Sequence, residues 1–347
     1  MTLSNPIISG FFLLGLLNNA SYVIMIAGAK SISEGSVALV FLCNVLPSFL
    51  CKLTSPVWFH RVEYKKRINA CVLLMSASFV VVAVGEDYKL KLLGVCFASL
   101  QSGLGEASIL ALSSLYPSPV LCLTSFSSGT GFAGIFGFAW AVDNQGLDSP
   151  RTNAGFSPSS PPPPMTVAER CSFTSSLSKY MFPLFVVYFA EYAMQSGTWA
   201  AIGFPVTSSS ARADFYTRAN WTYQAGVFVS RSSGTVYRPT LLAVQSMPVL
   251  QVLLLLFFYF VAYSQSLYSY ALLLPPCFLA GLLGGCVYVN AFSLISVSVR
   301  PRLRELALAT ASAADSCGIM AADAAGLLLQ ACLYEKHGIE GAKVKCF

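Results

Sequence analysis

One acidic residue stands inside a long apolar run near the middle of the chain. The run, residues 181–192, reads MFPLFVVYFAEY, and its acid is Glu191. An acid at the centre of a lipid bilayer costs roughly 2.5–3.5 kcal/mol on insertion scales. Glu191 is therefore expected to face the interior of a helical bundle or a water-filled cavity, and such a cavity is typical of a transporter.

The composition agrees with a chain that lies mostly in lipid. Of its 347 residues, 55% are hydrophobic and 10% are charged, whereas soluble domains carry about 25% charged residues. The net charge of +6 comes from basic residues scattered through short loops, which does not indicate nucleic-acid binding. These features predict an all-α multi-pass membrane protein.

Apolar runs of about 20 residues mark the expected membrane spans. We predict nine strong spans and a weaker one, about ten in all, near 7–29, 36–58, 68–84, 91–112, 121–142, 180–204, 239–263, 270–295, 306–333 and, weakly, 219–230. The first run resembles a signal peptide at Ala27-Gly28-Ala29, but it is too long and has no basic residue before it. We interpret it as a retained membrane helix.

Three loops carry concentrated positive charge, and the positive-inside rule places all three in the cytosol. They are Arg61 with Lys65-Lys66-Arg67, Arg231 with Arg238, and Arg300 with Arg302 and Arg304. The first and second loops are separated by five predicted spans if the weak one is counted, and an odd number cannot return the chain to the same side. Either the weak segment does not cross, or one span is missing from 143–179.

The region 143–179 is the one clear break in composition. It contains the sequence SPSSPPPP at 157–164, which is typical of a disordered, polyproline-like linker. We therefore predict an N-terminal membrane half at 1–142, a linker at 143–179, a C-terminal half at 180–335 and a tail at 336–347. A role of the linker as an SH3- or WW-type ligand remains an alternative.

Stripes of small residues indicate where helices approach closely. Such residues recur every four positions in three spans and predict helix packing rather than substrate binding. The stripes are Ser99-Gly103-Ala107-Ala111, Gly129-Ala133-Gly137-Ala141, and Gly281-Gly285. Glu106 lies beside the first stripe, where it either lines a cavity or accepts hydrogen bonds from hydroxyls of a neighbouring helix.

Other polar residues inside spans are candidates for a solute or proton path. Around Glu191, the residues Tyr188, Gln195 and Thr198 follow helical spacing and form one polar stripe. In the last span Asp315 is central, and Asp323 has a weaker claim. Further candidates for lining the cavity are Asn18, Tyr22, Tyr288 and Asn290, and Asn220 begins a possible glycosylation sequon, Asn-Trp-Thr.

Sequence signatures of enzymes and cofactor sites are absent. The chain contains no nucleophile elbow, zinc-protease motif, Walker A loop or dinucleotide fingerprint. Its 11 cysteines form no C-x-x-C pair and it has only two histidines, so we expect neither a metal site nor a bound cofactor. We predict a protein that is not an enzyme.

Six phrases in this sequence together resemble the battenin family of lysosomal membrane proteins. In order they are FLLGLLNNASYV at 12–23, SGLGE at 102–106, SSGTG at 127–131, VYFAEY at 187–192, YQAGVFVSRSS at 223–233 and LLGGCVYVN at 282–290. The resemblance implies an eleven-helix fold similar to major facilitators and equilibrative nucleoside transporters, in a lysosomal, vacuolar or late-endosomal membrane. It also implies a part in glycerophosphodiester clearance, organelle pH and basic amino-acid levels.

This chain departs from the family pattern in three ways. The family has a sixth span after the SSGTG helix, and none is found in 143–179, which matches the odd count of spans. The polar N-terminal tail of the family is missing. The terminal Cys346-Phe347 is not a prenylation box, so lysosomal sorting is less directly supported than for the family.

These observations lead to one main hypothesis and one alternative. The first is a secondary transporter of a small polar or anionic solute, in which Glu106, Glu191 and Asp315 line a cavity and one of them binds a proton. Arg231 would attract the anion at the cytosolic mouth, unless it is an ordinary positive-inside anchor. The alternative is a non-transporting scaffold that regulates vesicle trafficking and lysosomal pH. A membrane-embedded lipid enzyme is disfavoured, because no nucleophile–base pair is present.

Overall fold

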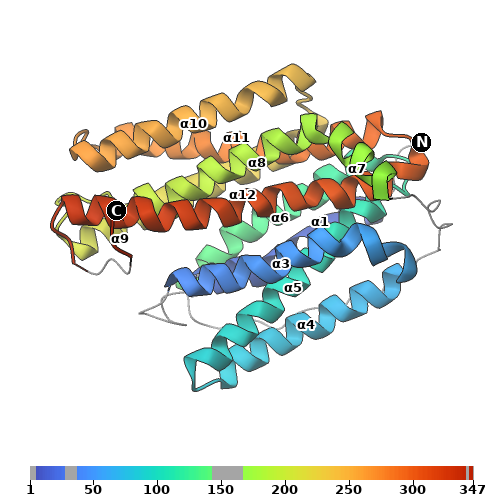
Figure 1. Ribbon diagram of the computed structural model, residues 1–347, viewed down its shortest axis with the longest axis horizontal. Helices are drawn as coiled ribbons and strands as arrows, with labels where there is room; N and C mark the ends of the chain where they lie inside the picture. Colours follow the sequence, from blue (N-terminus) through green and yellow to red (C-terminus); the bar gives the residue numbers. More distant parts are fainter. Residues whose placement is uncertain (1–4, 28–36, 143–166, 341–343, 347) are drawn as a thin grey trace. The chain divides into compact units, whose positions relative to one another are not determined.

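The computed structural model describes residues 5–27, 37–142, 167–340 and 344–346, and within these ranges the regular structure is entirely helical (Figure 1). The Pro/Ser-rich run at 157–164 lies outside the described residues. The α-helices are α1 (Asn5–Ala27), α3 (Val37–Trp58), α4 (Tyr64–Val84), α5 (Tyr88–Ser113), α6 (Pro119–Val142), α7 (Val167–Ser176), α8 (Ser178–Ala193), α9 (Ser209–Ser232), α10 (Leu241–Ser264), α11 (Tyr270–Ser298) and α12 (Pro301–Lys336).

Seven helices in the described part of the chain are long and apolar enough to cross a membrane: α1, α3, α4, α5, α10, α11 and α12. This pattern confirms the all-α membrane class. The helices α4 and α10 expose large aliphatic side chains such as Leu73 and Leu242. A surface of this kind suits lipid, since lipid-facing helices bury their backbone polar groups internally and present apolar side chains outward.

The chain forms two compact units, each of which is described by itself. Unit 1 contains residues 1–177 and 295–313, and unit 2 contains 178–294 and 314–347. The predicted halves, 1–142 and 180–335, assigned residues 295–313 to the second half. In the structure these residues belong to unit 1, so the helix α12 begins in one unit and continues in the other.

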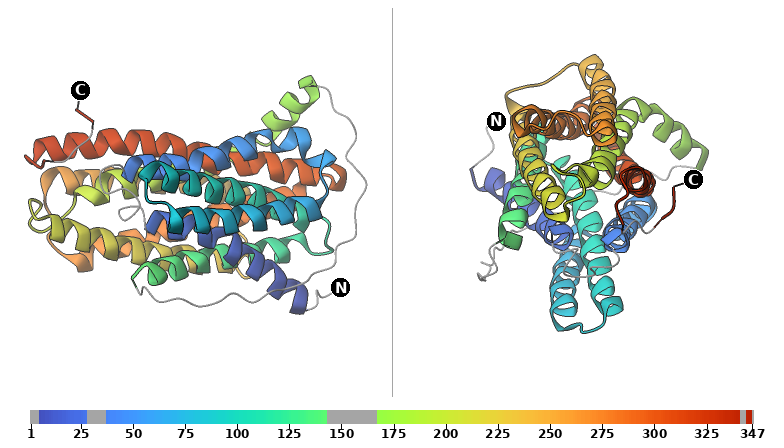
Figure 2. Two further views of the ribbon diagram at one scale, coloured as in Figure 1. Left: turned by 90° about the horizontal axis from the view of Figure 1, so that it is seen from below. Right: turned by 90° about the vertical axis from the view of Figure 1, so that its left-hand side faces the viewer.

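In unit 1 several helices approach one another closely at glycine residues, which have no side chain to hold them apart. Gly15 of α1 and Gly129 of α6 each lie against the backbone of the other helix, at Phe126 and Phe12 respectively. Gly103 of α5 meets Ser48 of α3 in the same way. The predicted role of the small-residue stripes as packing faces is thus confirmed here, and Figure 2 shows these helices running side by side.

In unit 2 two pairs of helices also approach closely at a glycine. Gly281 of α11 lies against the backbone of Tyr223 in α9, and Gly318 of α12 lies against the backbone of Phe185 in α8. The core beside these contacts is aromatic, with Trp199 and Phe258 at 5.5 Å between ring centroids. These close approaches bring residues of α8, α9, α11 and α12 within reach of one another.

The predicted span at 180–204 is not one regular helix. The α-helix ends at Ala193, a π-helical turn covers Met194–Thr198, and a 3₁₀ turn covers Trp199–Ala201. The predicted helical spacing of Gln195 and Thr198 is therefore wrong beyond Ala193, because a π turn changes the register of the side chains. Such interruptions are frequent at functional sites. The short helix α7 lies in the region that we predicted to be a linker.

Candidate functional site

Glu191 lies in the core of unit 2 with only 2% of its surface exposed. The hydroxyl of Tyr223, on α9, donates a hydrogen bond to Glu191 Oε1. The other oxygen, Oε2, has no hydrogen-bond partner among the described residues. It occupies the space that a side chain at Gly284 of α11 would fill. The predicted burial of this carboxylate is confirmed.

A guanidinium group contacts Tyr188, which precedes Glu191 by about one turn of α8. Arg231, near the end of α9, donates from Nη2 to the Tyr188 hydroxyl at 2.8 Å. Its Cζ lies 4.3 Å from the centre of the Tyr288 ring, in a cation–π arrangement. The rings of Tyr188 and Tyr288 are 6.4 Å apart. Two tyrosines therefore hold the orientation of Arg231 within unit 2.

Asp315 of α12 completes a group of charged residues around Tyr188. The side chains of Arg231, Glu191 and Asp315 all lie close enough to Tyr188 to interact with it electrostatically. Asp315 is buried, and its Oδ1 accepts a hydrogen bond from the Ser316 backbone N–H at 2.6 Å. We call Tyr188, Glu191, Arg231, Tyr288 and Asp315 the unit 2 cluster.

Three other predicted residues lie in unit 2, and two of them have hydrogen bonds within their own helical turns. Asn290 donates to the carbonyl of Cys286 at 2.9 Å, one turn earlier in its own helix. Thr198 donates to the Met194 carbonyl at 3.1 Å, within the π turn. Gln195 is partly buried, and its Nε2 has no partner among the described residues. None of these bonds joins the unit 2 cluster.

Asn220, the possible glycosylation site, is buried in the structure. Asn220 is 1% exposed and lies in the middle of α9, where its Nδ2 donates to the Tyr216 carbonyl at 2.8 Å. A sequon must be accessible on a surface loop to accept a glycan. The sequence motif occurs here inside a packed helix.

Glu106 lies in unit 1 and is paired with a cation that sequence reasoning missed. Lys52 Nζ of α3 lies 2.7 Å from Glu106 Oε2, with the two side chains 3% and 14% exposed. We had predicted that Glu106 either lines a cavity or accepts hydrogen bonds from hydroxyl groups, and neither prediction included this ion pair. The available signal was Lys52 itself, a charged residue within a predicted span.

Asn18 and Tyr22 of α1 belong to a polar network in unit 1. Asn18 Nδ2 donates to the Ser102 carbonyl at 3.2 Å, and its Oδ1 accepts from Gln101 Nε2 at 3.1 Å. The backbone carbonyl of Tyr22 accepts from Asn44 Nδ2 at 3.2 Å. The network links α1, α3 and α5, and Asn18 has both ends of its amide occupied.

A second buried cation in unit 1 was also missed. Arg67 is 3% exposed and lies 3.8 Å from Glu305 Oε1 of α12, which also accepts from the Tyr64 hydroxyl at 2.6 Å. The Arg67 Cζ lies 3.9 Å from the centre of the Tyr64 ring. Arg67, which we had interpreted only as a signal of membrane topology, therefore also contacts the first turns of α12.

The structure thus brings five of the predicted residues together within one unit. Glu191, Asp315, Arg231, Tyr188 and Tyr288 meet within unit 2, whereas the predicted residues Glu106, Asn18 and Tyr22 belong to unit 1. In the described part of the chain, the acidic, cysteine and histidine side chains do not gather into a group able to hold a metal ion.

Comparison with known proteins identifies the family. A family model described as CLN3 protein matches residues 9–152 and 159–336. The protein btn1 of Schizosaccharomyces pombe is 31% identical over 368 residues, covering 92% of each chain. The battenin of Canis lupus familiaris is 30% identical over 395 residues, covering 90% of this chain and 87% of its own.

The length of these alignments bears on the missing span. The comparison with btn1 runs over 368 positions, but 92% of this chain is only about 319 residues. About 49 positions of the relative therefore have no counterpart here. That length is enough for one membrane span with its loops, which needs about 20 residues for the helix.

Solved structures show the fold. The Escherichia coli fucose:proton symporter aligns with a TM-score of 0.60 at 14% identity, covering 95% of this chain and 96% of its own. A bacterial homologue of the lysosomal transporter Spinster aligns with a TM-score of 0.50 at 14% identity. Both are transporters of the major facilitator type. With the family model matching most of its length, the chain belongs to the CLN3, or battenin, family and is a multi-pass protein of the lysosomal or vacuolar membrane.

Proposed function

We propose that this protein is a secondary transporter that exports a small anionic solute, such as a glycerophosphodiester, from the lysosome or vacuole. The observation that carries this proposal is the unit 2 cluster, which combines one oriented guanidinium with a buried carboxylate. The major facilitator fold supports it, because solved relatives with that fold include a proton-coupled symporter. Support of organelle pH and of basic amino-acid levels would follow from proton-coupled flux.

Arg231 is the proposed anion-binding residue. A guanidinium presents several N–H donors in a planar fork, which suits the paired oxygens of a phosphodiester. Tyr188 accepts a hydrogen bond from Nη2 of Arg231, and the centre of the Tyr288 ring lies 4.3 Å from its Cζ. This arrangement fixes the plane of the fork in advance, and preorganisation lowers the entropy cost of binding.

Glu191 is the proposed proton-binding residue. While ionised, its carboxylate would leave Oε2 enclosed without a donor, and burying an unsatisfied charged oxygen is costly. Binding a proton removes that cost. A group that gains a proton on the acidic side of the membrane and loses it on the other can couple solute export to the pH gradient. Asp315 is the second candidate for this role.

Flux measurements in reconstituted vesicles with an imposed pH gradient test the proposal. Glu191→Gln keeps the size and the hydrogen bond from Tyr223, so we expect flux to continue but to lose its dependence on the gradient. Arg231→Lys keeps the charge and loses the fork, so we expect the KM for the anion to rise about tenfold or more, equivalent to about 1.4 kcal/mol.

The exposed Arg238→Lys is the matched control for Arg231→Lys and should leave flux unchanged. If the flux through Glu191→Gln depends on the pH gradient as it does in the wild type, Glu191 is excluded as the coupling site. A folded wild-type protein that carries no glycerophosphodiester under any gradient would favour the non-transporting scaffold instead.

A further inference from the structure

Within each unit, one pair of helices meets at a glycine with the same geometry. In unit 1, a Cβ added at Gly129 of α6 would lie 2.9 Å from the carbonyl carbon of Phe12 in α1 and close to the backbone nitrogen four residues later. In unit 2, a Cβ added at Gly318 of α12 would lie 3.2 Å from the carbonyl carbon of Phe185 in α8, and again close to the backbone nitrogen four residues later. Phe12 and Phe185 therefore occupy corresponding positions in the two units.

Asn18 and Glu191 lie six residues beyond these phenylalanines, one in each unit. A Cβ added at Gly105 of α5 would fall on the side-chain oxygen of Asn18 and would lie 2.9 Å from its Cγ. A Cβ added at Gly284 of α11 would fall on Glu191 Oε2 and would lie 2.9 Å from its Cδ. A second helix contact thus gives the same correspondence. The position that holds a carboxylate in unit 2 holds a neutral amide in unit 1.

Each unit also places a cation beside the residue that follows this second glycine. In unit 1 that residue is Glu106, and Lys52 Nζ of α3 lies 2.7 Å from its Oε2. In unit 2 it is Gly285, and a Cβ added there would lie 3.0 Å from Cγ of Arg231. Lys52 therefore corresponds to Arg231, the proposed anion-binding residue. The units differ in where the carboxylate lies, which is beside the cation on α5 in unit 1 and on α8 in unit 2.

The Lys52–Glu106 pair is not explained by stability. Its two side chains are 3% and 14% exposed, so both charges have lost most of their contact with water. Apolar residues of similar volume in place of a buried ion pair are often neutral or stabilising, whereas loss of one partner alone is strongly destabilising. The pair therefore contributes little net stability, but it makes the charge of Lys52 depend on a negative charge beside it.

A small anion can supply this negative charge in place of Glu106. The pair is open to water on the side of Glu106, its more exposed member. A proton on Glu106 removes the carboxylate charge, which is unfavourable unless another anion takes its place. An anion beside Lys52 is in turn repelled by an ionised Glu106. Each ligand therefore raises the affinity for the other, and by linkage the two factors are equal.

Other titratable and polar groups around Glu106 come from α1, α3, α4 and the first turns of α12. Arg67 of α4 donates to Ser108 Oγ of α5 at 3.4 Å and is ion-paired with Glu305. Further side chains at this part of α5 are the thiols of Cys51 and Cys71 and, from α1, Asn18 and Tyr22. Arg67 thus has a carboxylate of its own, and Lys52 is the cation that contacts Glu106.

We propose that Lys52 and Glu106 form a proton-linked anion site in unit 1. A small soluble phosphodiester takes the place of the Glu106 carboxylate beside Lys52, and Glu106 takes up a proton from water at the same time. The summed charge is zero before the exchange, with an ammonium and a carboxylate. It is zero afterwards, with an ammonium, a carboxylic acid and a phosphodiester anion. The choice of this anion rests on the function proposed for the unit 2 cluster, whereas the exchange at Lys52 does not.

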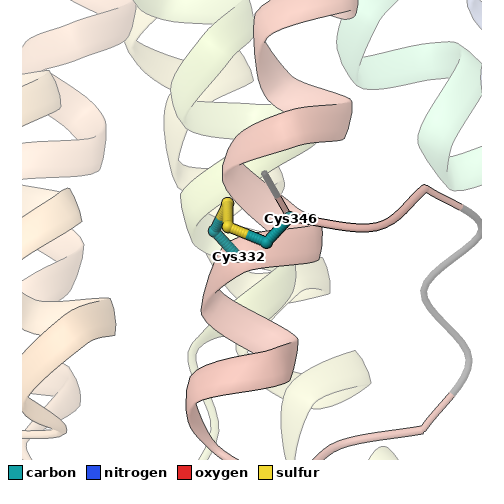
Figure 3. The surroundings of a disulfide bond; sticks show 2 residues. All are labelled: Cys332 and Cys346. Atoms are coloured by element: carbon teal, nitrogen blue, oxygen red, sulfur yellow. A yellow bond between two sulfur atoms is a disulfide. The ribbon is translucent and has the colours of Figure 1, made fainter.

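Anion binding by the purified protein tests the exchange. Dimethyl phosphate is the probe, because it keeps one negative charge at every pH used, and its apparent Kd is taken from the rise in melting temperature in detergent. In the wild type one proton enters with each anion, so we expect the Kd to tighten by up to about tenfold for each pH unit below neutral. The protein is kept free of reducing agents, because a disulfide joins Cys332 to Cys346 in unit 2 (Figure 3).

Three variants assign the effect to the pair. Glu106→Gln cannot ionise, so its Kd should not depend on pH and at neutral pH should be about tenfold tighter than that of the wild type, or more. Lys52→Met/Glu106→Met should fold and should lose both the binding at this site and its pH dependence. Glu63→Gln is the matched control, because it breaks the exposed pair of Glu63 with Lys66 and should bind as the wild type does.

The same titrations in an Arg231→Lys background separate the two sites. An affinity that Arg231→Lys leaves unchanged would contradict the function proposed for the unit 2 cluster and would leave the comparison at Lys52 intact. Equal Kd and equal pH dependence in the wild type and in Lys52→Met/Glu106→Met would overturn the present proposal, whether or not Glu106→Gln folds. Stabilisation by added phospholipid but not by dimethyl phosphate would overturn the choice of a soluble anion.

Discussion

A methyl group added at Gly284 tests the geometry around Glu191. In Gly284→Ala the new Cβ would fall on Glu191 Oε2 and would come within 2.9 Å of the carboxylate carbon Cδ. The carboxylate must shift to make room, and its other oxygen accepts a hydrogen bond from Tyr223 that such a shift would disturb. Overpacking in a tight core costs about 1–3 kcal/mol. Alanine favours the helix over glycine by about 0.5–1 kcal/mol, and this offsets part of the overpacking cost.

We therefore expect Gly284→Ala to destabilise the protein by about 1 kcal/mol, near the middle of the range of about 0–2.5 kcal/mol that these two opposing effects leave. Gly10→Ala is the matched control, because an added Cβ at Gly10 has no atom within 4 Å. That variant should be neutral or slightly stabilised. Thermal unfolding of the purified protein in detergent measures both, with a shift of about 2 °C for each kcal/mol.

A double-mutant cycle assigns the effect to the carboxylate. In a Glu191→Ala background the space beside Gly284 is empty, so Gly284→Ala should no longer destabilise. The expected coupling energy is about 1 kcal/mol or more, as is usual for residues in contact. Equal melting temperatures for Gly284→Ala and Gly10→Ala, together with additive effects in the cycle, would refute the reasoning.

Three further predictions follow from contacts elsewhere in the molecule. Glu106→Gln leaves the ammonium group of Lys52 buried without its carboxylate, so we expect the free energy of unfolding to fall by about 3–5 kcal/mol. The double variant Lys52→Met/Glu106→Met should recover most of the melting temperature, and a double variant as unstable as the single one would contradict this. Hydrogen bonds from Arg218 and Tyr270 lower the pKa of Asp214 in the folded protein. The contribution of Asp214 to stability is therefore fully present above the pKa of the unfolded chain, about 3.9, and is lost as the pH falls through the lower pKa of the folded protein. The difference in melting temperature between wild type and Asp214→Asn should thus stay constant from pH 7 down to about pH 4 and shrink only below it. Asn220→Gln should leave electrophoretic mobility and endoglycosidase response unchanged, and a loss of mass in this variant would show that a glycan is attached to Asn220.

Much of the architecture could be predicted from the sequence because lipid imposes a local rule. A helix that crosses the bilayer must satisfy its own backbone and must be apolar over about 20 consecutive residues. For that reason the predicted spans at 36–58, 239–263 and 270–295 agree closely with α3, α10 and α11. The break in α8 after Ala193 has no such local signal, and the regular helical spacing predicted beyond it was wrong.

The candidate site was predicted in its residues but not in its contacts. The cost of burying a charge was enough to select Glu191 and Asp315 from the sequence, and six short phrases were enough to indicate the family. The partners came only from the fold. Tyr64 and Glu305 are separated by 241 residues, and sequence periodicity carries no information on contacts at that distance.

The sequence by itself therefore determined the class of protein, most of its spans and the acids that must be buried, because each follows from the transfer of single residues from water to lipid. The tertiary structure decided which charges are paired. It joined Lys52 to Glu106 and Arg67 to Glu305, and it left one oxygen of Glu191 enclosed beside Gly284. These outcomes depend on how closely particular helices approach, and that distance is set by packing between segments far apart in the chain.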